Sequence, residues 1–171
     1  MRKVIVNSTP LIALSHVHQL SILRELYGKI TIPKAVYKEI SVKKNSVCAV
    51  EVEKALDWIH IEPIKNEMAK SMYKTQLHEG EVEVMILAKE SGADLVIIDD
   101  LNAKKHAKYL GLTVTGTLGV LIKAKEKGLL TELKPILKAM VQKNIYIKES
   151  LIAMCLKQVG EETEKLDIKN D

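Results

Sequence analysis

Aromatic residues are scarce in this sequence of 171 residues, which contains no phenylalanine and one tryptophan. Its composition is therefore a poor match for proteins that bind single-stranded nucleic acid by stacking bases on aromatic side chains. Apolar runs are also short, and none approaches the ~20 residues of a membrane-spanning helix. The opening MRKVIVNSTPLIAL is broken by polar residues and predicts strand, turn and helix rather than a targeting segment. We expect a cytoplasmic protein without a membrane segment.

Cysteine occurs twice, at Cys48 and Cys155, with no CxxC spacing. Two distant cysteines within apolar helical patterns argue against a zinc site and a disulfide framework, so we expect both to be buried as apolar side chains. The formal net charge of +4 is mild. It does not predict a dedicated nucleic-acid arm, but it is compatible with a polyanionic partner bound at a local patch.

Short apolar segments alternate with amphipathic ones, which is typical of an α/β protein with a parallel sheet. We predict a three-layer fold in which helices flank a sheet of four to five strands. The predicted strands cover residues 2–7, 29–32, 58–64, 95–98 and 112–115.

Helices are predicted between these strands and after the last one. The first has Thr9 as its N-cap and Pro10 at its first position, and another covers residues 66–76. A single domain, residues 1–159, is predicted to end in two helices, the first interrupted by Pro135. A charged tail over residues 160–171 has almost no apolar content and is predicted to be disordered.

The strand that begins at residue 95 is an apolar run without polar alternation, as expected for burial on both faces, and it stops at Asp99 and Asp100. Asn7 ends the first strand in the same way. In an open parallel sheet, polar groups at the carboxyl ends of strands line a ligand crevice where the strand order reverses. With right-handed connections, we expect Asn7 to lie beside the two aspartates.

Two glutamates are expected to approach the same edge. Glu39 lies on the helix after the second strand, and Glu81 follows Gly80 at the start of the helix before the fourth strand. Glu79 and Glu83 share this helix start, where the helix dipole favours acids, and this explains them without a ligand role. Clustered carboxylates repel unless a cation neutralises them, so the pattern predicts a hard divalent ion, Mg²⁺ or Mn²⁺. Such an ion activates water against a phosphodiester, which indicates hydrolysis of a nucleic-acid backbone.

At these residues the sequence resembles the PIN-domain ribonucleases, which include the VapC toxins of toxin–antitoxin pairs. The resemblance runs from Val4 to about Lys157 and is carried by VIVNSTPLIAL, VYKEI, GEVEVMILAKE and LVIIDDLNAKKHAKYLGLTVTGTLGVLIKAK. The GTLGVL segment after the last strand marks one branch of the family. The resemblance implies a PIN-like fold and a metal-dependent endoribonuclease that uses water as its nucleophile. The implied metal ligands are Asn7, Glu39, Glu81 and Asp99, and the implied catalytic acids are Glu39, Glu81, Asp99 and Asp100.

Asn7 departs from the family pattern, in which an Asp stands at this position. An amide offers a neutral oxygen where a carboxylate offers a charge, so affinity for a divalent ion falls, although Asp100 beside Asp99 offsets part of the loss. The alternative to an active ribonuclease is a catalytically weakened or silent PIN-like module with a binding or regulatory role. A receiver-like domain, in which an aspartate accepts phosphate, is disfavoured because its acid pair follows the first strand.

Basic residues follow the acids on the next predicted helix. Lys104 and Lys105 suit contact with RNA phosphates, whereas Lys108 is farther from the acids and is expected to be solvated. The resemblance further implies a homodimer and a small antitoxin protein that covers the acidic cleft.

Overall fold

The computed structural model describes residues 2–73 and 77–161. Within these ranges, five parallel strands form one sheet in the order β3-β2-β1-β4-β5. The strands are β1 (Val4–Val6), β2 (Ile30–Pro33), β3 (Ile59–Glu62), β4 (Leu95–Ile97) and β5 (Val114–Thr115). All five predicted strands are present, and the predicted parallel α/β fold is confirmed.

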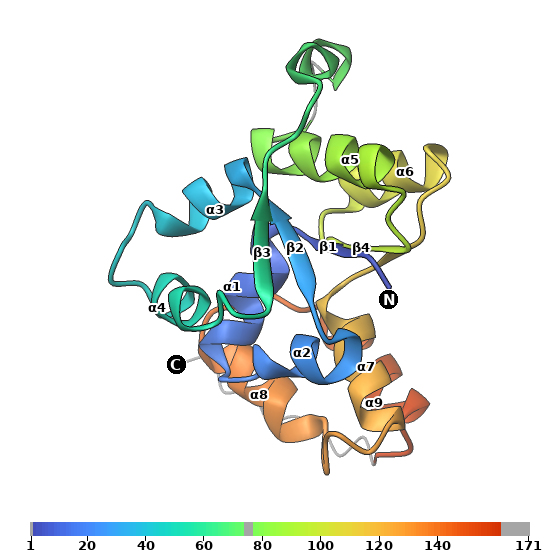
Figure 1. Ribbon diagram of the computed structural model, residues 1–171. Coiled ribbons are helices and arrows are strands. Elements are labelled where there is room, and N and C mark those ends of the chain that lie inside the picture. The colour runs from blue at the N-terminus through green and yellow to red at the C-terminus, as the bar shows by residue number, and fades with distance from the viewer. Residues whose placement is uncertain (1, 74–76, 162–171) are drawn as a thin grey trace.

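Helices cover both faces of this sheet (Figure 1). They are α1 (Ser8–His16), α2 (Ser21–Tyr27), α3 (Lys34–Ser41), α4 (Val47–Lys54), the 3₁₀ helix η1 (Glu67–Tyr73), α5 (Glu79–Ser91), α6 (Leu101–Tyr109), α7 (Thr117–Glu126), α8 (Lys134–Gln142) and α9 (Glu149–Gln158). In the view of Figure 1, α5 and α6 lie above the strands, while α2, α7, α8 and α9 lie below them. The sheet is therefore the middle of three layers, as predicted.

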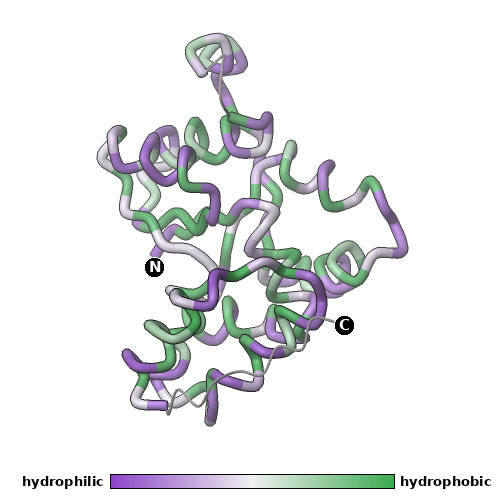
Figure 2. Tube along the Cα trace, turned by 180° about the vertical axis from the view of Figure 1, so that it is seen from behind, coloured by the Kyte–Doolittle hydropathy of each residue, from purple (hydrophilic) through white to green (hydrophobic). Residues whose placement is uncertain are grey.

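The central strands are buried on both faces. Every residue of β1 and β4 is buried, which explains why their sequences lack the alternation of a half-exposed strand. β3 lies at the edge of the sheet and is followed by Pro63, which has no N–H to donate to a neighbouring strand. Figure 2 shows hydrophobic residues concentrated along the strands and on the helix faces turned toward them. Cys48 and Cys155 are buried with free thiols, as predicted.

The first helix starts earlier than predicted. Its N-cap residue is Asn7 and its first residue is Ser8, so Thr9 is not the N-cap and Pro10 lies within the first turn. The backbone N–H of Asn7 donates to the carbonyl oxygen of Ile97 (2.9 Å), a bond of the β1–β4 ladder. The chain therefore passes from strand to helix within a single residue, and this places Asn7 directly at the edge of the sheet.

Two later helices also differ from the prediction. Pro135 lies in the first turn of α8, where N–H groups have no intrahelical partner, so it does not interrupt the helix. Where the structure describes it, the helix predicted over residues 66–76 is the 3₁₀ helix η1, and residues 74–76 lie outside the described residues.

Most of the predicted tail, residues 162–171, also lies outside the described residues. Glu161, at the start of that tail, accepts hydrogen bonds from the backbone N–H groups of Leu133 (2.5 Å) and Lys134 (2.8 Å) at the start of α8. Specific contacts of the domain thus extend to residue 161. Among the described residues, no helix has the length and apolar character needed to cross a membrane.

Candidate functional site

The strand order reverses between β1 and β4. β1 pairs with β2 on one side and with β4 on the other. The sheet therefore extends through β2 and β3 on one side of β1 and through β4 and β5 on the other. Val6 lies opposite Ile97, which places Asn7 and Asp99 just beyond the ends of neighbouring strands. Such a reversal forms the ligand crevice of open α/β sheets. The structure thus brings Asn7 and Asp99 to the same edge.

Asn7 is buried at this edge, with 3% of its surface exposed. Its Oδ1 atom is shielded from solvent and accepts no hydrogen bond from any residue that the structure describes. A buried acceptor without a partner costs about 1–3 kcal/mol. A cation would supply the missing partner, because an amide oxygen is a suitable ligand for a hard ion.

Gly80 brings the start of α5 close to Asn7 and to Glu39 of α3. A Cβ atom built on Gly80 would lie 2.9 Å from Oε2 of Glu39 and 3.6 Å from Oδ1 of Asn7. Because glycine has no side chain, a space remains beside Gly80, and two oxygens from different elements lie next to it. Helix α3 packs directly on α5, and this contact holds the exposed Glu39 at the edge.

Glu81 lies in the first turn of α5 and is 7% exposed. Its Oε2 accepts a hydrogen bond from the backbone N–H of His78 (3.0 Å), which fixes the side chain at the start of the helix. Burial raises the pKa of Glu81 above its ordinary value, and the nearby charges of Asp100 and Glu39 raise it further, against the lowering effect of the His78 bond. A cation beside Glu81 would relieve this repulsion.

Asp99 is held by the start of α7. Its Oδ1 accepts a hydrogen bond from the backbone N–H of Thr117 (2.7 Å), and its Oδ2 accepts one from the Thr117 hydroxyl (2.6 Å). Thr117 is 5% exposed, so both bonds are shielded from water. The sequence prediction did not include Thr117. A threonine that opens the helix after one strand, next to a strand that ends on an acid, is the signal that points to it.

Asp100, the next residue, is the N-cap of α6. Its Oδ1 accepts a hydrogen bond from the backbone N–H of Ala103 (2.8 Å), which satisfies one of the free N–H groups of the first turn. The residue is exposed, and its charge contributes to the raised pKa of Glu81. Asp100 therefore caps a helix, and its charge also acts on Glu81.

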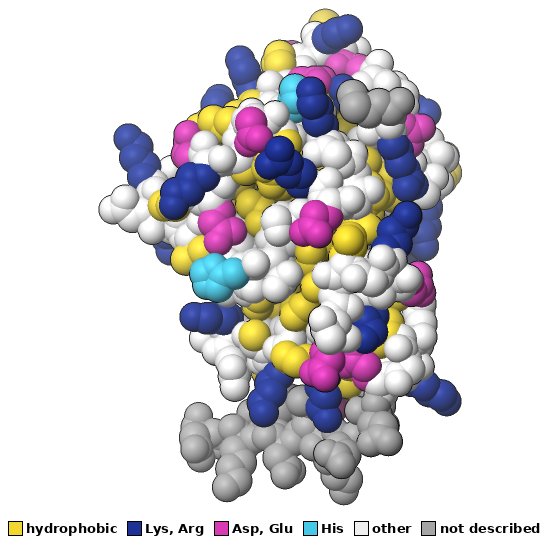
Figure 3. Space-filling model, turned by 60° about the horizontal axis from the view of Figure 1, so that its bottom comes forward, with side chains coloured by type: hydrophobic (Ala, Val, Ile, Leu, Met, Phe, Trp, Pro, Cys, Tyr) yellow, Lys and Arg dark blue, Asp and Glu magenta, His cyan; other side chains and the backbone are white. Residues whose placement is uncertain are grey.

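Lys104 reaches the edge from α6. A Cβ built on Gly116 would lie 2.7 Å from Nζ of Lys104 and 2.7 Å from Oδ1 of Asp99, so the ammonium and the carboxylate share the space beside this glycine. Lys104 is half-buried, whereas Lys105 and Lys108 are exposed. On the face shown in Figure 3, lysine and arginine side chains are scattered among acids and apolar groups. That face therefore shows no broad basic patch that could bind RNA instead of the predicted Lys104 and Lys105.

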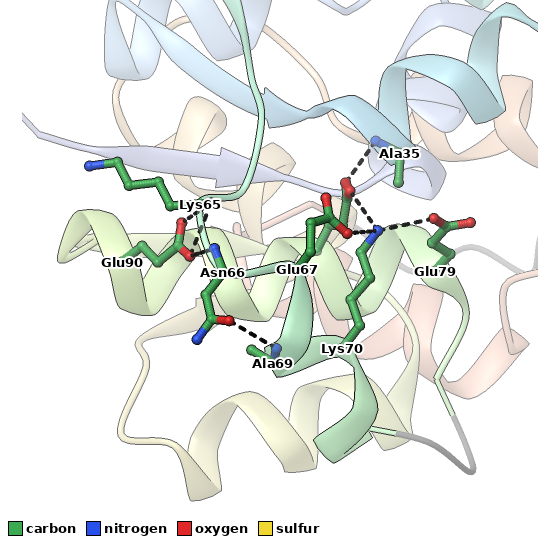
Figure 4. Close-up of polar contacts among 9 residues, drawn as sticks. Ala35, Lys65, Asn66, Glu67, Ala69, Lys70, Glu79 and Glu90 are labelled. Atoms are coloured by element: carbon green, nitrogen blue, oxygen red, sulfur yellow. Dashed lines mark hydrogen bonds and ion pairs between the residues drawn. The ribbon is translucent and has the colours of Figure 1, made fainter.

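The other two acids at the start of α5 contact Lys70 of η1. Its Nζ lies 3.3 Å from carboxylate oxygens of Glu79 and Glu83 and 2.9 Å from Glu67 (Figure 4). Glu83 is 4% exposed and also accepts a hydrogen bond from the backbone N–H of Ala35 (2.9 Å). The hydrogen bonds to the three carboxylates raise the pKa of Lys70 far above its ordinary value. Glu79 and Glu83 thus join η1 to α5, and Glu83 also joins α3 to α5.

The chemistry of the edge fits a hard divalent ion. Asn7, Glu39 and Glu81 offer only oxygen atoms, the ligands that Mg²⁺ and Mn²⁺ prefer, and the Asn7 oxygen lacks a partner within the described residues. Across residues 2–73 and 77–161, no three His, Cys, Asp or Glu side chains are gathered closely enough to form a metal site by themselves. The acids are neighbours at one edge and not a closed ligand shell.

Comparison with known proteins identifies the family. The DUF3368 family, described as a PIN domain, matches residues 3–161. The chain belongs to the PIN-domain family. Its fold is similar to that of a PilT N-terminus domain protein from the hyperthermophilic archaeon Sulfolobus solfataricus P2, with a TM-score of 0.51, 18% identity, and coverage of 71% of this chain and 92% of that chain.

A domain of a functionally unknown protein from Methanocaldococcus jannaschii is also similar to this PIN domain. Its TM-score is 0.46, with 20% identity and coverage of 68% of this chain and 91% of that chain. No curated protein matches the chain.

Membership in the PIN-domain family confirms the resemblance seen in the sequence. PIN domains are commonly nucleases and typically use divalent metals. In this PIN domain, Asn7 and Glu39 converge at Gly80, the residue before Glu81, whereas Asp99 is bonded to the start of α7. The structure therefore brings the first three predicted ligands to one turn of α5 and orients the fourth toward a different helix.

Proposed function

We propose that this PIN domain is a metal-dependent endoribonuclease of the VapC toxin type, which hydrolyses phosphodiester bonds of single-stranded or loop RNA. One observation carries the proposal. The buried Oδ1 of Asn7, unpartnered within the described part of the chain, and Oε2 of Glu39 converge on the space left by Gly80. Two oxygen ligands from different elements are thereby held next to Glu81, whose charged form is disfavoured by burial and by like charges.

In this proposal Asn7, Glu39 and Glu81 hold the divalent ion, and Asn7 is the weakest ligand because an amide carries no charge. A bound Mg²⁺ or Mn²⁺ would activate water and stabilise charge on the phosphodiester. The surrounding carboxylates would accept hydrogen bonds from that water and orient it. Lys105, exposed on α6, is better placed for an RNA phosphate than Lys104, whose ammonium lies beside Gly116.

Cleavage of a single-stranded RNA by the purified protein with Mn²⁺ tests the proposal. We expect slow cleavage by the unmodified protein, faster cleavage by Asn7→Asp, and no cleavage by Glu81→Gln. Glutamine keeps an acceptor for the N–H of His78, so this variant removes the charge without opening the helix start. Equal cleavage by Glu81→Gln and the unmodified protein, or cleavage without any divalent ion, would contradict the proposal.

The second candidate is a PIN-like module that binds RNA or protein without cutting. The neutral amide of Asn7 and the ammonium of Lys104 favour it, because both make the edge less attractive to a divalent ion. In the same assay, this function is supported if the unmodified protein is inactive with Mn²⁺ and cleavage appears only in Asn7→Asp. Binding of intact RNA in the absence of divalent ions then measures the remaining function.

The proposed partners follow from the VapC type. They are RNA, a second copy of the chain in a homodimer, and a small antitoxin protein over the acidic edge, all within the cytoplasm. Light scattering of the purified protein measures its oligomeric state. A short reading frame directly upstream of the gene, whose product suppresses RNA cleavage when added, would identify the antitoxin.

A further inference from the structure

The start of helix α8 has no cap of its own. Its N-cap residue, Leu133, is apolar, and Pro135 in its first turn has no N–H group. The backbone N–H groups of Leu133 and Lys134 instead donate to the two carboxylate oxygens of Glu161, at 2.5 Å and 2.8 Å. The next N–H group, that of Ile136, donates to the carbonyl oxygen of Leu133 (3.1 Å). Glu161, which follows α9, therefore supplies the acceptors that the start of α8 lacks.

A lysine near the end of α7 also contacts this carboxylate. Nζ of Lys125 lies 3.4 Å from Oε1 of Glu161, and it donates to the carbonyl oxygen of Thr131 in the connection between α7 and α8. Burial raises the pKa of Glu161, but the two backbone N–H groups and the Lys125 ammonium lower it by more, so it lies below its ordinary value. The end of α7, the start of α8 and the chain after α9 thus meet at one carboxylate.

This cap acts between distant parts of the sequence. A local N-cap bonds N–H groups two or three residues later, whereas Glu161 lies 27 residues after Lys134. The carboxylate reaches α8 only when α9 is folded and in place, so the two helices depend on the same closing contact. The most extensive packing of α9 against another element is with α7 and not with a strand. Helices that share their stabilising contacts in this way open together as one cooperative unit.

We propose that residues 133–161, with helices α8 and α9, form a carboxyl-terminal strap that Glu161 closes, and that this strap opens as a unit while the sheet stays folded. Opening breaks the contacts of Glu161 with α7 and α8 together. It exposes side chains that are buried in the closed strap, among them Leu137, Ile152 and Cys155. The inference is independent of metal binding and RNA cleavage, because no residue of the strap belongs to the acidic edge.

Two buried thiols make this opening measurable. Cys155 lies on α9 within the strap and Cys48 lies on α4 outside it, and each is 3% exposed. Burial raises the pKa of both thiols, so neither reacts readily in the closed protein. The rate of alkylation by an excess of N-ethylmaleimide therefore measures the opening of the surroundings of each cysteine. Mass spectrometry of the digested protein assigns a rate to each residue.

The unmodified protein provides the first test. We expect the alkylation of Cys155 to depend less steeply on urea concentration than global unfolding does, because opening of the strap exposes only part of the surface that unfolding exposes. Circular dichroism gives the urea dependence of global unfolding. If the alkylation of Cys155 has this same dependence, the strap opens only when the whole domain unfolds, and the proposal is overturned.

Glu161→Gln tests the closing contact. Glutamine keeps one oxygen for one N–H group of α8, but it leaves the other N–H without an acceptor and removes the counter-charge of Lys125. We expect the alkylation of Cys155 to become about 10- to 100-fold faster, as the loss of hydrogen bonds to a charged group implies, while the rate at Cys48 changes by less than about threefold.

Glu126→Gln is the matched control. It removes an exposed carboxylate next to Lys125 in α7 and should change both rates by less than about twofold. Equal acceleration of the two cysteines in Glu161→Gln would mean that Glu161 stabilises the domain as a whole. An unchanged rate at Cys155 would mean that Glu161 does not close the strap. Either result overturns the proposal.

Discussion

Replacing Gly80 by alanine is expected to weaken metal binding while leaving the stability of the fold almost unchanged. The new Cβ would lie 2.9 Å from Oε2 of Glu39 and 3.4 Å from Cγ2 of Val36. The first contact is too short, so the Glu39 carboxylate must move away, and the buried Val36 must adjust slightly. Because the carboxylate ends a flexible and exposed side chain, its movement costs little free energy, but it takes an oxygen away from Asn7.

The expected change in stability is correspondingly small. Gly80 has no positive φ, so alanine gains about 0.5–1 kcal/mol over glycine within the helix. Crowding against Val36 opposes this gain, since an added methyl group in a packed site costs at least about 1 kcal/mol. We expect the free energy of unfolding to change by less than about 1 kcal/mol from these two opposing terms. Mn²⁺ affinity should fall about tenfold, which corresponds to about 1.4 kcal/mol.

Gly92→Ala, at the other end of α5, is the matched control. Gly92 has φ +61° and nothing within 4 Å of an added Cβ, so alanine there meets no clash but must adopt a left-handed backbone. That conformation costs about 1–2 kcal/mol. Urea unfolding and Mn²⁺ titration should show opposite patterns: Gly80→Ala keeps stability and loses affinity, and Gly92→Ala does the reverse. Unchanged Mn²⁺ affinity in a stable Gly80→Ala protein refutes the role given to the Asn7 and Glu39 oxygens.

Substitutions at three further residues test other contacts of the protein. Because folding raises the pKa of Glu81, the folded state binds this proton more tightly than the unfolded chain, and stability is lost as pH rises above the ordinary value of 4.5. Glu81→Gln should therefore raise the unfolding temperature of the metal-free protein at about pH 7–8, with the difference vanishing toward pH 4, and a lower temperature at neutral pH would contradict this. Lys70→Met should destabilise the protein by about 1–2 kcal/mol in urea unfolding, because it leaves the buried Glu83 with only its backbone donor. The raised pKa of Lys70 keeps this contribution intact up to its ordinary value of 10.5, so an equal effect of the substitution is expected at about pH 6 and 9. Thr117→Val should lower the free energy of unfolding by about 1–3 kcal/mol, because it removes a shielded donor to Asp99, and Thr117→Ser should retain the stability of the unmodified protein. Equal stability of the valine and serine variants would contradict the role given to this hydrogen bond.

The arrangement of the strands could be predicted because local patterns and general rules agree. The unbroken apolar runs of β1 and β4 indicate burial on both faces, and alternating helices indicate parallel pairing. The reversal of strand order then places Asn7 next to Asp99, as the register of Val6 with Ile97 shows. Gly80 was predicted at the start of a helix, but its contact with Glu39 depends on how α3 packs on α5, which no local pattern specifies.

The finer chemistry of the edge lies beyond sequence patterns for a physical reason. Asp99 and Asp100 have the same side chain and adjacent positions, so nothing local distinguishes them. Their roles diverge because a strand end turns one carboxylate toward Thr117 of α7, while the next residue becomes the N-cap of α6. Lys104 belongs to the site through the packing of α6 beside Gly116, and its position in a run of basic residues predicted only a solvated or RNA-facing side chain.

Two side chains of this edge change its charge in the same direction. Asn7 provides a neutral oxygen where an aspartate would add a negative charge, and Lys104 places a positive charge beside Asp99. Both lower the attraction for a divalent ion, and the neutral Asn7 also adds no like charge to the repulsion around Glu81 when no ion is bound. Metal affinity and metal-free stability should therefore vary inversely among substitutions at Asn7. A polar cluster with a purely structural role has no such relation, because each substitution in it removes contacts and lowers stability whatever happens to metal binding.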